Sequence, residues 1–152
     1  MTHTRRAALV LTIALLVGGE AAAAPMVAVT GAWVRPTPAG ANAAGYLNLS
    51  AAAGDRLIGA ESPVASRVSI HQSRMQGAMM TMRTLPALTL PAGATVRLAP
   101  GGLHLMLEAL RLPLAIGDQA PAVLIFEKAG RVPVRFKVRS GPHTPGMADM
   151  KM

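Results

Sequence analysis

Turn-forming residues divide most of the chain into short segments. Glycine and proline recur at short intervals between Pro36 and Gly141, and the runs between them are too short for typical helices. Short strands separated by regular turns are typical of an all-β sandwich or barrel, so the pattern predicts an all-β fold. The candidate strands are residues 27–34, 45–49, 56–60, 67–71, 80–85, 95–98, 103–107, 122–127 and 132–138.

The clearest alternation of apolar and polar positions lies in residues 131–139. Valine and phenylalanine occupy the even positions, while arginine, lysine and one proline occupy the odd ones, as in a strand with one buried face. Pro133 cannot donate a ladder hydrogen bond, which predicts a strand at an edge or paired on one side only near that residue. Gly130 predicts a hairpin turn with a positive φ. The basic row is most simply a solvated face that opposes aggregation, and a docking role is the alternative.

The first 24 residues have the pattern of a secretory signal peptide. Arg5 and Arg6 precede an apolar run at residues 7–17, and three alanines at 22–24 provide the small residues that signal peptidase reads. The apolar run is shorter than the roughly 18 residues needed to cross a bilayer. A cleaved signal at residues 1–24 and a mature periplasmic protein are therefore expected, with a membrane anchor as the alternative.

Composition narrows the chemistry that this chain can perform. The 152 residues include no cysteine, which excludes disulfides, thiolate nucleophiles, iron–sulfur clusters and blue-copper sites. Ten methionines stand beside one Trp, one Tyr and two Phe, so the core is expected to be aliphatic, and no stacking platform for nucleic acid is available. The net charge of +8, or +7 without the signal, favours acidic partners or an anionic membrane surface. With seven acidic residues and no Ser-His-Asp arrangement, the protein is not expected to be an enzyme.

Histidine and methionine recur at strand spacing, which predicts a site for a soft metal. In residues 103–107 the leucines occupy alternate positions, so His104 and Met106 project together from the other face, with Cα atoms roughly 6.5–7 Å apart. His71 ends a strand on its polar face, and a following hairpin would bring Met82 back beside it. Thioether sulfur and neutral imidazole suit Cu(I). The four side chains are candidate ligands of one Cu(I) ion in a pocket that faces solvent, although each taken alone is more simply a packing or surface residue.

The spacing of these four residues resembles that of a known family. His71, Met82, His104 and Met106 follow the pattern His, ten residues, Met, twenty-one residues, His, one residue, Met. This pattern is that of the periplasmic copper chaperones of the PCuAC type, and the similarity extends over residues 32–138. Flanking sequence also resembles the family at residues 79–83, 90–93, 100–102 and 117–118.

The resemblance implies a fold, a cargo and a destination. It implies a single cupredoxin-like Greek-key β-sandwich or barrel at residues 25–140. It also implies delivery of Cu(I) toward the CuA site of cytochrome c oxidase, with oxidase subunit II or a Sco-type protein as acceptor. A copper-buffering or resistance protein without a dedicated acceptor would use the same ligands and is the alternative. Family members often carry an acidic residue about two positions before His71, where this chain has Ser69.

Other methionines and histidines lie outside this set of four. Met75, Met79 and Met80 lie near the expected site, where packing is the first interpretation and a path for the ion is the second. Residues 141–152 are expected to form a flexible tail. The tail contains His143, Met147, Met150 and Met152. Similar extensions in the family bind Cu(II) or a second copper, and an inert terminus is the alternative.

A b-type haem protein with His and Met axial ligands is a further rival. It would need a large apolar pocket, and the aromatic residues to line such a pocket are few.

Overall fold

The computed structural model describes residues 26–141, which contain ten strands and no helix. The strands are β1 (Ala28–Val34), β2 (Ala43–Ser50), β3 (Asp55–Glu61), β4 (Ala65–Gln76), β5 (Met79–Leu85), β6 (Leu88–Leu90), β7 (Thr95–Leu98), β8 (Leu103–Leu110), β9 (Gln119–Phe126) and β10 (Gly130–Val138). The all-β prediction is confirmed. Within the described part of the chain, no helix is long and apolar enough to span a membrane. The expected signal peptide at residues 1–24 and the tail residues His143, Met147, Met150 and Met152 lie outside the described residues.

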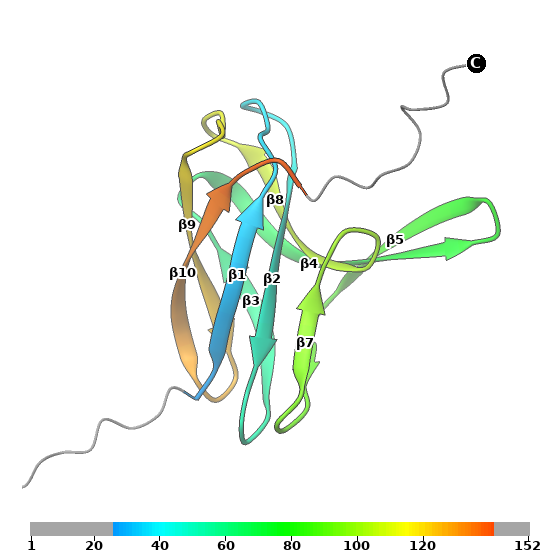
Figure 1. The fold of residues 1–152 in the computed structure, drawn as a ribbon, viewed down its shortest axis with the longest axis vertical. Coiled ribbons are helices and arrows are strands. Elements are labelled where there is room, and N and C mark those ends of the chain that lie inside the picture. Colours follow the sequence, from blue (N-terminus) through cyan, green and yellow to red (C-terminus); the bar gives the residue numbers. More distant parts are fainter. Residues whose placement is uncertain (1–25, 142–152) are drawn as a thin grey trace, which may run out of the picture.

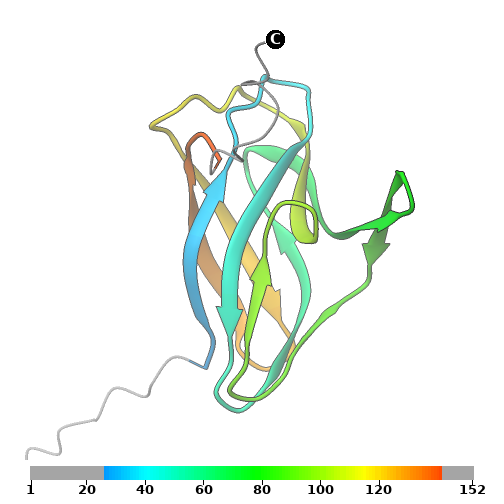
Figure 2. The ribbon, with the colours of Figure 1, turned by 45° about the vertical axis from the view of Figure 1, so that its right-hand side comes forward.

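Seven of the strands close into a barrel (Figures 1 and 2). The hydrogen-bonded order is β5-β4-β8-β2-β1-β10-β9-β3-β6, and an additional pairing of β3 with β4 closes the ring. The strand β7 pairs with β2 outside this order. Closure pairs strands that would otherwise be free edges of a sheet, and it leaves β5 at the outside of the ring.

The barrel interior is filled mainly by aliphatic side chains, with two phenylalanines among them. The largest fully buried side chains are Phe126, Phe136, Leu47, Leu49, Leu57, Leu90, Leu105, Leu107, Leu124 and Val34. β8 supplies Leu105 and Leu107 to this core, and neither has exposed surface. Because side chains alternate along a strand, His104 and Met106 face the other side of β8.

The pairing of β10 differs between its two edges. From Gly130 to Lys137 it pairs with β9. With β1 it pairs only at its end, where Lys137 and Val138 are opposite Trp33 and Val34. Pro133 lies in the part that is paired on one side only, as the sequence predicted. The predicted hairpin turn is also present: β9 ends at Phe126, and Gly130, opposite it at the start of β10, has a φ of 72°.

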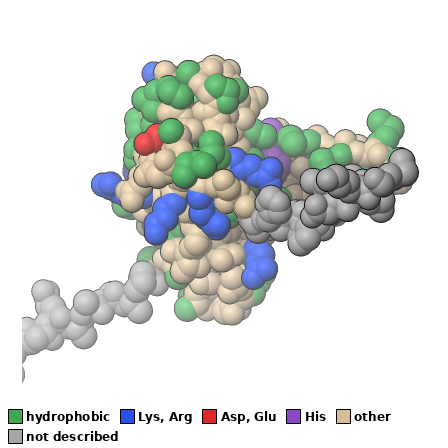
Figure 3. Space-filling model, turned by 45° about the horizontal axis from the view of Figure 1, so that its top comes forward, with side chains coloured by type: hydrophobic (Ala, Val, Ile, Leu, Met, Phe, Trp, Pro, Cys, Tyr) green, Lys and Arg blue, Asp and Glu red, His purple; other side chains and the backbone are tan. Residues whose placement is uncertain are grey.

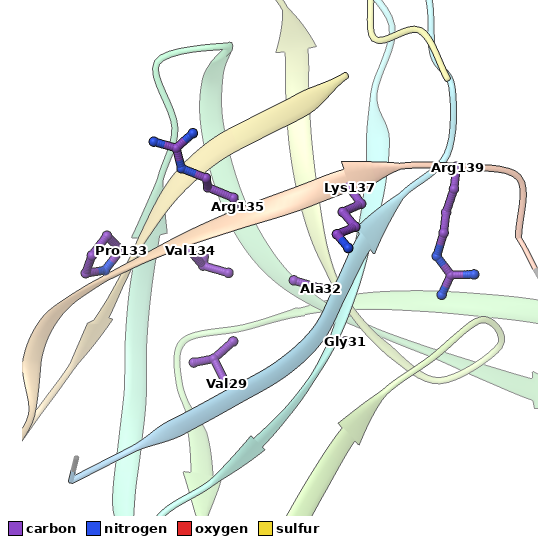
Figure 4. A pocket seen from close by; sticks show the side chains of 8 residues that line it. All are labelled: Val29, Gly31, Ala32, Pro133, Val134, Arg135, Lys137 and Arg139. Atoms are coloured by element: carbon purple, nitrogen blue, oxygen red, sulfur yellow. The ribbon is translucent and has the colours of Figure 1, made fainter. Parts of the chain in front are cut away.

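A cleft of about 560 Å³ opens where β1 and β10 diverge (Figure 4). The side chains of Arg135, Lys137 and Arg139 line it together with apolar residues of both strands. Figure 3 shows that lysine and arginine side chains gather on the barrel surface. Three basic side chains repel a cation, so this cleft does not suit a copper ion.

The β4–β5 hairpin projects from the barrel (Figures 1 and 2). The sequence placed the end of this strand at His71, but β4 continues to Gln76. The extension was missed because the residues of β4 beyond Ser73 and most of β5 are exposed, so they show no alternation of buried and polar positions. The short strand β6 was missed as well, because three residues are too few to show a period.

Candidate metal centre

The four candidate ligands lie on one face of three adjacent strands. β4 lies between β5 and β8, and His71 is directly opposite His104 in the antiparallel register. Met106 follows His104 by two residues on β8, so both share that face. On β5, the residue opposite His71 is Thr84, and Met82 lies two residues before it on the same face. The strand register thus aligns residues that are far apart in the sequence.

Distances show how closely three of these side chains approach. The Nδ1 atom of His71 lies 3.2 Å from the Sδ atom of Met82. The rings of His71 and His104 have centroids 5.6 Å apart at an interplanar angle of 65°. With metal–imidazole bonds of about 2.0 Å, one ion fits between two rings at this separation. Met106 shares their face and is half-buried.

His104 is the most buried member of the set, with 4% of its surface exposed. Its Nδ1 atom lies 3.1 Å from the carbonyl oxygen of Gly102, which can only accept, so Nδ1–H is the donor. The Nε2 atom is buried and has no hydrogen-bond partner. Burial lowers the pKa of His104, a backbone hydrogen bond to Gly102 opposes this, and the nearby charge of His71 lowers it further. The ring is therefore neutral at pH 7 and carries a bare lone pair on Nε2, as a metal ligand requires.

The burial of His104 refines one expectation from the sequence. The sequence predicted a pocket that faces solvent, and in the structure its solvent-facing part is Met82, which is 51% exposed, while His104 is buried. His71 is intermediate, with 15% of its side chain exposed. The site is therefore open on the β5 side and closed on the β8 side.

His71 is oriented by a chain of hydrogen bonds. Its Nε2 atom lies 2.9 Å from Ser69 Oγ, and that hydroxyl donates to Glu108 Oε1 at 2.6 Å. Because the serine proton is committed to Glu108, Ser69 accepts from His71 Nε2–H. The Thr84 hydroxyl lies 3.3 Å from the same nitrogen. The lone pair of His71 is consequently on Nδ1, the atom beside Met82.

Glu108 is a residue of the site that the sequence analysis missed. The family resemblance predicts an acidic residue about two positions before His71, where this chain has Ser69. Glu108 instead comes from β8, where it is opposite Arg67 in the register. Hydrogen bonds from Ser69 and Arg67 hold the pKa of Glu108 below its ordinary value, so it is ionised near neutral pH. Its position two residues after Met106, on the same face of the strand, was the available signal.

Aromatic side chains of β1 and β2 lie beside His104, next to the β8 side of the site. The ring of Tyr46 lies 6.4 Å from that of His104, and Trp33 lies 4.7 Å from Tyr46. The guanidinium of Arg139 lies 4.6 Å from the centre of the Trp33 ring. Burial raises the pKa of Tyr46, and the charge of Arg35 partly opposes this. The stack keeps water away from the buried ring of His104.

The fold and the arrangement of this site define a PCuAC-type domain. The copper-bound PCuAC domain from PmoF2 superposes with a TM-score of 0.64 at 30% sequence identity, covering 78% of this chain and 97% of that domain. The solution structure of CuI-DR1885 from Deinococcus radiodurans has a TM-score of 0.61 at 29% identity, covering 80% of this chain and 83% of that one. The family and the cupredoxin-like fold expected from the sequence are both confirmed.

Sequence comparison gives the family. Residues 27–138 match the family described as "Putative lipoprotein LpqE-like". A putative lipoprotein of Leifsonia xyli subsp. xyli (strain CTCB07), Lxx21020, is 33% identical over 115 residues, which cover 74% of this chain and 69% of that protein. The chain belongs to the LpqE-like family.

Proposed function

We propose that this protein binds one Cu(I) ion through His71, Met82, His104 and Met106 and passes it to an acceptor protein. The observation that carries the proposal is the buried Nε2 atom of His104, which has no hydrogen-bond partner and lies in a ring that faces His71. A buried polar atom without a partner costs stability. A metal ion that accepts this lone pair removes the cost.

The donor set favours Cu(I) among the common metals. Two thioethers and two neutral imidazoles are soft or borderline donors, whereas Zn(II) usually takes thiolate, imidazole or carboxylate. Methionine binds without losing a proton and forms no disulfide, so the set stays available in an oxidising compartment. Four neutral ligands leave the charge of the ion uncompensated, which limits affinity and suits a protein that must release its cargo.

The unequal exposure of the ligands gives release a direction. Met82 is half exposed and lies on β5, at the outside of the ring, whereas His104 is buried against Tyr46. An acceptor's ligand would therefore approach from the β5 side and replace Met82 first. His104 would leave the ion last.

The location and acceptor follow from the family and from the sequence. Relatives described as lipoproteins and copper-bound structural neighbours support a role outside the cytoplasm. We place the mature protein in the periplasm and take the acceptor to be cytochrome c oxidase subunit II, at its CuA site, or a Sco-type protein. The net positive charge of the chain is suited to an acidic docking surface on that acceptor.

An anaerobic Cu(I) titration against a chromogenic chelator tests the binding step. We expect one tight site per chain in the wild type and a loss of at least about tenfold in affinity for His104→Ala and Met106→Ala, because each removes a ligand. Met79→Leu removes a thioether outside the set and should bind as the wild type does. Zn(II) binding as tight as Cu(I), or unchanged affinity in both ligand variants, would contradict the proposal.

A further inference from the structure

Four methionines on the β4–β5 hairpin are exposed to solvent. The exposed fractions are 62% for Met75, 71% for Met79, 59% for Met80 and 51% for Met82. The first interpretation from the sequence, that the methionines near the site pack in the interior, is therefore wrong for Met75, Met79 and Met80. The hairpin projects from the barrel, so these side chains have no core to fill (Figures 1 and 2).

The strand register sorts these methionines onto two faces of the hairpin. Met75 is directly opposite Met80, and opposite residues of an antiparallel pair have Cβ atoms about 4.5–5.5 Å apart. Met82 follows Met80 by two residues, so it shares the same face. His71 lies on this face as well, four residues before Met75. Met79 is opposite Gln76, one position away, and faces the other side.

Charge separates the two faces in the same way. The paired positions on the methionine face between His71 and Met80 carry only His, Ser, Met and Thr side chains. Arg74 and Arg83 both occupy the other face, where Met79 also lies. A cation that approaches the hairpin is repelled by the arginine face and meets three neutral thioethers on the methionine face.

We infer that Met75, Met80 and Met82 form a second, weaker Cu(I) site through which the ion enters the main site. The long, unbranched methionine side chains have enough rotatable bonds to converge on one ion from these positions. Met82 belongs to both sites, and its Sδ atom lies 3.2 Å from His71 Nδ1. The ion can therefore stay bound to Met82 while the sulfurs of Met75 and Met80 are replaced by His71 and then by the two ligands on β8.

The transfer is an exchange of neutral ligands, and copper remains Cu(I) throughout. Thioethers carry no proton, and the hydrogen bond from His71 Nε2–H to Ser69 places the lone pair of the ring on Nδ1, beside Met82. The inference rests on the proposed function, because the path ends at the proposed Cu(I) site. The experiments below therefore measure Cu(I) binding at the second site and at the main site separately.

The equilibrium test follows the methionine methyl groups by NMR. Protein labelled with ¹³C at the methionine methyl groups is titrated anaerobically with Cu(I) to two equivalents. We expect the Met82 and Met106 signals to shift with the first equivalent, and the Met75 and Met80 signals to shift with the second, which these two sulfurs hold while Met82 stays on the first ion. The Met79 signal should stay in place, because its face has no second thioether. Equal shifts of Met79, Met75 and Met80 would overturn the inference, since they would indicate unspecific binding to exposed sulfur.

The kinetic test measures the loading rate by stopped flow, from a Cu(I)–chelator complex of known affinity. The double variant Met75→Leu/Met80→Leu should load at least about threefold more slowly, while the equilibrium affinity of the main site changes less than twofold. Met79→Leu is the matched control and should change neither value. Leucine has a similar volume and these positions are exposed, so the fold should be retained.

The outcomes separate the inference from the proposed function. If Met82 and Met106 shift and bind tightly but the double variant loads as fast as the wild type, the second site is refuted and the main site stands. If neither Met82 nor Met106 responds to Cu(I), the proposed function fails, and with it the path that was to end there.

Discussion

Each histidine of the candidate centre is held by a different kind of partner. The backbone carbonyl of Gly102 holds His104, while the Ser69 hydroxyl, backed by Glu108, holds His71. Both partners leave one ring nitrogen available to a metal: Nε2 in His104 and Nδ1 in His71. Because a ring can bind a metal only through an unprotonated nitrogen, these partners select the tautomers that a metal site needs.

At the residue scale, the Ser69 hydroxyl can be tested alone. Ser69→Ala removes the acceptor that keeps the proton of His71 on Nε2, so we expect Cu(I) affinity to fall about tenfold, as for other partners that orient ligands. Ser66→Ala is the matched control, because the Ser66 hydroxyl bonds the Ala109 carbonyl on the same pair of strands. Competition with a Cu(I) chelator measures both variants. Equal affinities in the two variants would show that Ser69 does not orient the ligand.

At the scale of single elements, β8 serves the core with one face and the site with the other. Leu105 and Leu107 are fully buried, while His104 and Met106 lie between and beside them on the opposite face. This strand was predicted well because strict alternation is visible over five residues of sequence. β4 was predicted less well, because its last three residues, 74–76, are paired only with exposed β5 and have no core to impose a pattern.

Two substitutions on β8 should separate stability from binding. Leu105→Ala removes a buried side chain and should cost about 2–5 kcal/mol in the free energy of unfolding, while the folded fraction keeps its Cu(I) affinity. Met106→Leu conserves volume and should cost less than about 1.5 kcal/mol, but it removes a ligand and should weaken Cu(I) binding. Denaturant unfolding of the metal-free protein and the chelator assay measure the two properties. Loss of Cu(I) affinity in folded Leu105→Ala would contradict the assignment of faces.

At the scale of the whole molecule, closing the barrel requires contacts between distant segments. Asp55, at the start of β3, is buried with 7% of its surface exposed. Its carboxylate accepts hydrogen bonds from the backbone N–H groups of Arg56 at 2.7 Å, Lys128 at 2.9 Å and Ala129 at 2.9 Å. It thereby ties the turn between β9 and β10 to β3. Nothing in the sequence around residue 55 marks this contact, because the two partners in the turn, Lys128 and Ala129, are more than seventy residues away.

Asp55 should make the stability of the protein depend on pH. Burial by itself would raise the pKa of Asp55, but the three backbone hydrogen bonds outweigh it and lower the pKa from its ordinary value of 3.8. A lowered folded-state pKa adds stability above pH 3.8, and this stability is lost as the pH falls through the folded-state value. Asp55→Asn should cost about 1–3 kcal/mol at pH 7. It should also flatten the stability profile below pH 4, as measured by urea unfolding at a series of pH values.

The control for this prediction is the exposed Asp118. Its carboxylate accepts a single hydrogen bond from the backbone of Ala115, at 2.9 Å. Asp118→Asn should therefore change the free energy of unfolding less than Asp55→Asn does. If both variants lose the same stability, the three hydrogen bonds of Asp55 have no special role in the barrel.

The sequence by itself determined the all-β class, the alternation of β8 and β10, the turn at Gly130 and the four candidate ligands. These features depend on neighbours within a few residues, or on spacing that can be read along the chain. Only the tertiary structure decided that His104 is buried with a free Nε2, that Glu108 supports His71 through Ser69, and that three methionines share one face of a projecting hairpin. The reason is that burial, tautomer and cross-strand register are set by contacts between β4, β5 and β8, which form only when the chain folds.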